Sequence, residues 1–208
     1  MAGDPNGWQR TGHDEILRSL RQMIKAEFVS IRPADYVKHL KKESDRGAII
    51  LAASLVDDAL KEALGRKLEA ANSDEKTRIF DHMGSLGTFS SKIALAQALS
   101  IISRTVRKQI EIIKECRNVA AHAHIAVDFT TPQVVTGLVN MFDDEAAADV
   151  ASWTRVRLRD TFILLCGIHA DYIMEHDKTE NRTMNRLLLL LKLPRPAHRP
   201  LHGKSPAE

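Results

Sequence analysis

The segment Glu115 to His124, ECRNVAAHAH, contains the residue types best suited to chemistry. Histidine titrates near neutral pH, so His122 could transfer a proton at a ribose hydroxyl or at a leaving oxygen. The guanidinium of Arg117 could hold a phosphate and stabilise the charge of the transition state. Asn118 could orient either group. The first hypothesis is therefore a metal-independent RNase site formed by Arg117, Asn118 and His122.

Helical geometry limits this hypothesis. A long helix from about residue 104 is predicted by four apolar positions, Val106, Ile110, Ile113 and Ala120. Five residues on a continuous helix separate two side chains by about 140°. Chemistry then requires the helix to end before His122, or two chains to combine their motifs across a two-fold axis. In the structural alternative, Arg117 binds the last helical carbonyls or a buried carboxylate such as Asp57 or Asp58, and His122 complements the helix dipole.

A second hypothesis is DNA binding, because LAQALSIISRTVRKQI imitates a helix-turn-helix. In that arrangement Arg104, Arg107 and Lys108 would contact phosphates. Two departures argue against it. Ser100 occupies the turn position that prefers glycine for a positive φ, and the apolar Ile102 replaces a polar turn residue. A helix–loop–helix inside a bundle is the favoured interpretation.

A third hypothesis needs no special residue: a dimeric helical protein that controls a partner through protein contacts. Metal binding by His122, His124 and Asp128 has little support, since a third and fourth ligand at a familiar spacing are missing. His169 is expected in a polar groove or on the surface. No phosphate-binding, dinucleotide-binding or zinc-ribbon pattern occurs, and we expect no cofactor.

The elements that must position these residues are predicted to be helices throughout. At 208 residues, with 44% hydrophobic but only 5% aromatic content, the chain is expected to form one multi-helix bundle of the all-α class. Helices are predicted over residues 13–30, from Ser44 or Asp45 to about 64, over 92–103, from 132 and over 152–175. A last helix should run to about 193. Residues 72–88 are expected to form a loop around Gly84 and Gly87.

The domain prediction is a flexible arm over residues 1–12, the helical domain over 13–193, and a disordered tail rich in proline and basic residues over 194–208. The net charge of +3, from 30 basic and 27 acidic residues, is too balanced to imply nucleic acid by itself. Cys116 and Cys166 fit buried free thiols in a reducing compartment. Because no secretory or membrane-spanning segment is evident, we expect a cytoplasmic protein without membrane contact.

Three segments of the sequence resemble the MltR-type family, the mannitol operon repressor and its relatives. They are DRGAIILAASLVDDALKEAL, GSLGTFSSKIALAQALSII, and IKECRNVAAHAH with the following VDFTTPQV. The unusual loop Gly84, Leu86, Gly87, Phe89 and Ser90 carries most of the specificity. The likeness spans about residues 44–192. It implies an all-helical, intracellular, self-associating protein with a regulatory role in transcription or stress, acting through protein or nucleic-acid partners.

RNVAAH also resembles the arginine–histidine signature of HEPN domains, which are helical bundles found in many RNases of bacterial conflict systems. This second resemblance implies catalysis by Arg117 and His122, usually across a dimer, on RNA rather than DNA. The alternative function is therefore a toxin-like, metal-independent endoribonuclease. Whether the chain is an enzyme stays open at this point.

Overall fold

A computed structural model of the chain describes residues 15, 39–68, 71–142, 147, 149–150 and 152–175. The chain separates into two compact units, Met1–Tyr36 and Val37–Glu208, and every described residue except Glu15 belongs to the second. The described part contains six helices and no strand, which confirms the all-α prediction. The predicted arm, the last helix and the tail lie outside the described residues, as does the predicted helix over 13–30 apart from Glu15.

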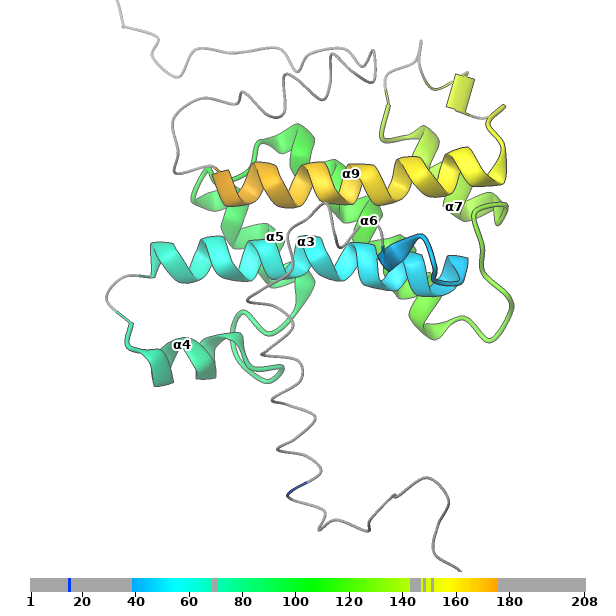
Figure 1. Ribbon diagram of the computed structural model, residues 1–208. Helices are drawn as coiled ribbons and strands as arrows, with labels where there is room; N and C mark the ends of the chain where they lie inside the picture. Colours follow the sequence, from blue (N-terminus) through cyan, green and yellow to red (C-terminus); the bar gives the residue numbers. More distant parts are fainter. Residues whose placement is uncertain are drawn as a thin grey trace, which may run out of the picture. The chain divides into compact units, whose positions relative to one another are not determined.

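Helix α3 (Asp45–Lys67) is the centre of the bundle and contacts α5 (Phe89–Ala98), α6 (Arg104–His122) and α9 (Arg155–Glu175) (Figure 1). It begins at Ser44, whose hydroxyl accepts a hydrogen bond from the Gly47 N–H at 3.1 Å. Small side chains let the neighbouring helices approach closely. The fully or almost fully buried alanines of α3 are Ala48, Ala52, Ala53, Ala59 and Ala63.

The direction of each helix follows from the contacts at its ends. Helix α9 runs parallel to α3, because its start contacts Asp45 while Met174 O, near its end, accepts a hydrogen bond from Arg66 at 3.2 Å. Helix α6 runs antiparallel to α3, since its last turn lies against Arg46. Helix α7 (Pro132–Val139) packs on α6. The link before α7, residues 123–131, contains bends and turns and no helix or strand.

Helix α4 (Ser73–Phe80) lies where a loop was predicted, so that prediction is wrong for residues 73–80. A capping box starts the helix: the Asn72 side chain accepts from Glu75 N, and the Glu75 carboxylate accepts from Asn72 N, both at 2.9 Å. This pair satisfies two free N–H groups and compensates for the absence of buried residues in α4. The N-x-x-E spacing was the sequence signal that could have predicted the helix.

The glycine loop after α4 is confirmed, and its geometry explains the glycines. A Cβ atom on Gly84 would lie 2.2 Å from Arg78 O, and one on Gly87 would lie 2.2 Å from Asp81 O. No side chain fits at either position without moving backbone. The loop then leads to Thr88, whose side chain caps α5 by accepting a hydrogen bond from Ser91 N at 3.0 Å. The helix begins at Phe89, three residues before the predicted start, and buries Phe89, Lys92, Ile93 and Ala96.

Helix α5 ends at Ala98, about five residues before the predicted end. Ser100 has a φ of 58°, in the left-handed region. Ser100 N donates to Gln97 O at 2.9 Å and Ile101 N donates to Ala96 O at 2.8 Å, which together form a Schellman turn. Serine therefore adopts the conformation that was expected to need glycine, so this objection to a helix-turn-helix-like turn does not hold. The following Ile102 is buried in the core.

Candidate functional site

The three residues of the RNase hypothesis lie on the last two turns of α6. The helix includes His122 as its last residue, and Ala123 is its extended C-cap. Arg117 and His122 are therefore about 140° apart on one continuous helix. The Asn118 amide donates a weak hydrogen bond to Glu115 Oε2 at 3.4 Å. Within one chain the structure does not bring Arg117 and His122 together, and their combination across two chains stays a prediction.

The carbonyls at the end of α6 are bound by Arg46 from the first turn of α3. Its Nε donates to Ala120 O at 2.5 Å and its Nη2 to Ala123 O at 2.6 Å. The structural alternative assigned this role to Arg117, and that assignment is wrong. Arg117 is half-buried and forms no hydrogen bond or ion pair within the part of the chain that the structure describes. His122 is exposed in the last turn of α6, where the helix dipole favours a cation.

Next to Arg46, the carboxylate of Asp45 is the centre of a buried ionic cluster. Arg155 Nε donates to its Oδ2 at 2.6 Å, Arg159 Nη1 donates to its Oδ1, and Phe129 N donates a longer bond of 3.4 Å. Burial raises the pKa of this carboxyl, but the hydrogen bonds from Arg155, Arg159 and Phe129 outweigh burial and leave the pKa below its ordinary value. Asp45 is therefore a carboxylate at neutral pH.

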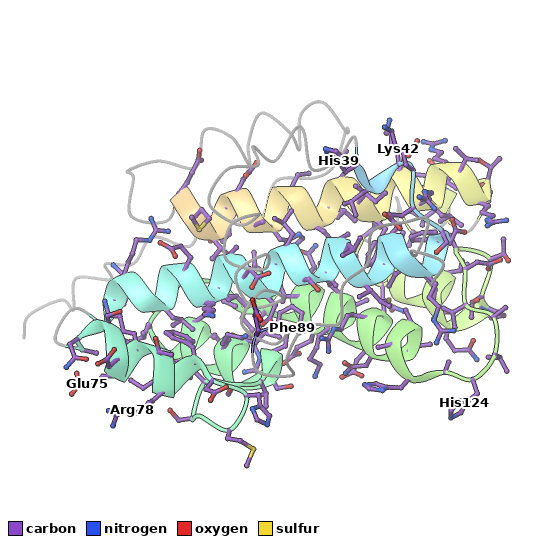
Figure 2. All side chains as sticks on the ribbon, turned by 60° about the horizontal axis from the view of Figure 1, so that its bottom comes forward. His39, Lys42, Glu75, Arg78, Phe89 and His124 are labelled. Carbon is purple, nitrogen blue, oxygen red and sulfur yellow. The ribbon has the colours of Figure 1, made fainter. Side chains whose placement is uncertain are left out.

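Arg159 extends the cluster, because its Nη2 also donates to Leu40 O at 2.8 Å and to Glu43 O at 2.5 Å. One side chain thus joins the start of α9 to the turn before α3. We call the surface formed by residues 39–46, 120–131 and 155–160 the arginine end. Figure 2 shows His39, Lys42 and His124 at this end and Glu75 and Arg78 at the other.

Sequence reasoning missed this cluster. It treated Asp45 only as a possible helix cap and gave no role to either arginine. The available signal was the pair Arg155 and Arg159, one turn apart at the start of an otherwise apolar helix, since such a pair needs a counter-ion if it is buried.

A second ionic cluster lies between α3 and α5. Lys92 is only 5% exposed, and its Nζ lies 2.8 Å from Asp57 Oδ1. The two charges are paired although the contact does not have hydrogen-bond geometry. Burial and the neighbouring Asp57 charge raise the pKa of the Asp58 carboxyl to about 6. Asp57 therefore pairs with Lys92, and the suggestion that Asp57 or Asp58 is the buried partner of Arg117 is wrong.

His169 is buried, contrary to the expectation of a groove or surface position. Its Nδ1 lies 2.7 Å from Leu165 O, and its Nε2 lies 3.0 Å from Gln109 Oε1. The Gln109 amide donates in turn to Met141 O at 2.9 Å. Burial lowers the pKa of His169. The imidazole thus connects α9 to α6 and to the end of α7, which is a structural role.

Both cysteines are free and buried, as predicted. Burial raises the pKa of the Cys116 thiol to about 11 and raises that of Cys166 well above its ordinary value. Because the thiolate is the reactive form, neither side chain is suited to nucleophilic chemistry.

The three residues of the nucleic-acid hypothesis lie on the first turns of α6. Arg104 and Lys108 are exposed. The Arg107 Nε donates to Glu111 Oε1 at 2.7 Å, and its Nη1 donates to Gln97 Oε1. Arg107 is therefore held along the helix surface, whereas Arg104 and Lys108 have no partner among the described residues.

Among the described residues, no group of three or more His, Cys, Asp and Glu side chains is arranged to hold a metal ion. None of the described helices is both long and apolar enough to span a lipid bilayer.

The fold and its polar clusters define a helical bundle in which the buried charges hold helices together. Among solved structures, the chain is similar to a chain in the X-ray structure of the MtlR–HPr complex from Escherichia coli. The TM-score is 0.55 at 17% identity, and the match covers 68% of this chain and 98% of the other. No protein-family model and no curated protein matches the sequence. At this identity the likeness supports the MltR-like fold, and the HEPN-type motif stays a prediction.

Proposed function

We propose that this chain is a regulatory protein of the MltR type that acts by binding a protein partner. The observation that carries the proposal is the structural likeness to almost the whole of one chain of the MtlR–HPr complex. The polar groups in the interior are consistent with a binding role. Asp45 and Asp57 are paired with cations across helix interfaces, and His169 is hydrogen-bonded in the core. These groups are used in packing, which leaves the surface to carry the function.

The proposal includes regulation of transcription or of a stress response inside the cell, and self-association into a dimer. Nucleic acid, RNA more than DNA, is the other class of partner that we consider. Arg104 and Lys108 support it, since both cations are exposed on the first turns of α6. Light scattering on the purified full-length chain measures the dimer directly.

The test of the protein partner uses HPr from the same organism as this chain, since HPr is what the neighbouring structure contains. Calorimetric titration should give a Kd below about 100 μM, in the range of transient regulatory complexes. The affinity-tagged chain should also retain a protein in stoichiometric amount when it is isolated from its host. Absence of HPr binding together with absence of any retained protein would overturn the proposal.

The alternative function is a metal-independent endoribonuclease using Arg117, Asn118 and His122. Its support is that His122 is exposed and that Arg117 has no partner among the described residues, so both side chains are available to a substrate. Because the two lie on different sides of α6, the working site must combine Arg117 of one copy with His122 of another.

The alternative is tested with labelled single-stranded and structured RNA in EDTA. We expect wild type to leave 2′,3′-cyclic phosphate ends and His122→Ala to leave the RNA intact. Mixing His122→Ala with Arg117→Ala chains should restore part of the activity if each site uses both copies. His124→Ala is the matched control, because it removes an exposed imidazole two residues away. Intact RNA with wild type overturns the alternative and leaves the regulatory proposal standing.

A further inference from the structure

The arginine end exposes two aliphatic side chains. Ile125 is 70% exposed in the link after α6, and Val156 is 67% exposed in the first turn of α9. Val156 lies between Arg155 and Arg157 in the sequence, and both arginines are exposed. An exposed aliphatic group beside guanidinium groups is typical of the centre of a protein interface, where arginine is enriched and lysine and glutamate are depleted.

An aromatic pair lies beside Arg157, the residue that follows Val156, and adds to the interface-like composition of this end. The Arg157 guanidinium lies 4.0 Å above the ring centre of Trp153, and the ring of Phe142 meets Trp153 edge-on at 5.9 Å. Tryptophan and arginine are the residue types that most often dominate binding energy. Stacking on Trp153 also restricts Arg157, so docking a partner costs less side-chain entropy there.

The charge at this end has a definite sign. The arginine end contains six Lys and Arg and four Asp and Glu residues, a net charge of +2. The opposite end, formed by residues 57–68, 71–83 and 171–175 and called the α4 end, contains five Lys and Arg and eight Asp and Glu, a net charge of −3. A negatively charged partner is therefore attracted to the arginine end and repelled from the α4 end.

The surface is also held in place by the ionic cluster beneath it. Arg155 and Arg159 bind Asp45, Arg159 binds two carbonyls of the turn before α3, and Arg46 binds two carbonyls at the end of α6. The three segments that make the surface are thus fastened to one another, and a partner meets a surface that needs little rearrangement.

We propose that the arginine end is a docking surface for an acidic protein that inserts an apolar side chain beside Val156. The inference rests on the proposed function and adds the surface and the chemistry of the partner. A protein fits better than a nucleic acid, because a protein can place carboxylates opposite the cations and keep them away from Glu43, Asp128 and Asp160, whereas a phosphate backbone carries a charge at every step. The exposed aliphatic groups gain nothing from a phosphate backbone.

The experiment places the photo-crosslinking residue benzoylphenylalanine at position 156 of the full-length chain in its host. A second chain carries it at position 83, where Met83 is 83% exposed at the α4 end. The crosslinked protein is identified, purified and titrated against wild type, Val156→Ser and Lys42→Glu. Met83→Ser and Arg78→Glu are the matched controls, because Met83 and Arg78 are exposed at the opposite end.

We expect one acidic protein to crosslink at position 156 and not at position 83. Val156→Ser and Lys42→Glu should each weaken its binding by about tenfold, while the controls change it by less than about twofold. Higher salt should weaken it further. Crosslinks of equal strength at both positions, crosslinks to RNA, or crosslinks to a second copy of the chain overturn this surface. A protein that binds but is insensitive to Val156→Ser and Lys42→Glu also overturns it while leaving the proposed function intact.

Discussion

The bundle contains two carboxylate–cation clusters at helix interfaces, which differ in the number of donors around the carboxylate. Asp45 accepts hydrogen bonds from two guanidinium groups and one backbone N–H, and its pKa is lowered. In the second cluster the ammonium group of Lys92 contacts Asp57, while Asp58 has only the more distant charges of Lys92 and Lys61. There the pKa of Asp58 is raised. The comparison teaches that the number and direction of donors, rather than the presence of a cation, decide whether a buried carboxylate stabilises the fold.

The largest expected loss of stability follows a substitution at Asp45. Asp45→Ala should lower the free energy of unfolding by about 4 kcal/mol, because it leaves Arg159 largely buried without its counter-ion and Phe129 N without an acceptor. Urea denaturation at pH 7 measures the loss. Asp45→Asn is the control, since it keeps the shape and one acceptor and should cost less. A loss under about 1 kcal/mol would mean that solvent replaces the carboxylate.

A substitution at Lys92 should cause the second largest loss of stability. Lys92→Met keeps the buried aliphatic stem and removes the ammonium group, so Asp57 loses its counter-ion. We expect a loss of about 2 kcal/mol at pH 7, smaller than at Asp45 because Asp57 is partly exposed and can be hydrated. Lys108→Met, at an exposed position on α6, is the control. If Lys92→Met costs as much as Asp45→Ala, donor number is not what distinguishes the two clusters.

Arg46 tests whether geometry or charge matters at the arginine end. Arg46→Met should cost about 1.5 kcal/mol, because two carbonyls at the end of α6 lose their donor. Arg46→Lys keeps the charge but has no planar fork, and should recover only part of the loss. Thermal denaturation of wild type, Arg46→Met and Arg46→Lys ranks their stabilities. Equal stability of Arg46→Lys and wild type would show that charge alone suffices.

The helices that the sequence predicts best are those with a long apolar stripe. For α3, α6 and α9 a helix was predicted and a helix is present. The four apolar positions that predicted α6 are all buried. Helix α4 was missed because it buries no residue, so apolar periodicity carries no signal there. Its capping box was readable, and local chemistry would have been the better guide.

The polar clusters were hardly predictable, for a physical reason. Arg46 caps a helix 74 positions away, and Arg159 binds a carboxylate 114 positions away. Such pairs form because the packed bundle brings helix ends together, and nothing in the local sequence selects one arginine over another. Arg117 resembled a capping residue for this reason, while Arg46 performs that role. The left-handed Ser100 is similar, since the core requirement at Ile101 overrides the preference for glycine.

The smallest expected effect is the pH dependence contributed by Asp58. Its pKa in the folded chain is about 6, above the ordinary value of 3.8. Between these values the folded chain holds a proton that the unfolded chain releases, so stability should fall as pH rises from about 4 to 6. Asp45 has the opposite sign, because a lowered pKa gives stability that is lost on acidification below about pH 4.

Asp58→Asn isolates that contribution. The variant should gain about 1 kcal/mol over wild type at pH 8 relative to pH 4, a figure reduced for the partial exposure of the side chain. The measurement is urea denaturation of both proteins across this pH range. Asp160→Asn, an exposed aspartate, should change nothing by comparison. A wild-type slope that persists in Asp58→Asn would show that Asp58 is not the source of the pH dependence.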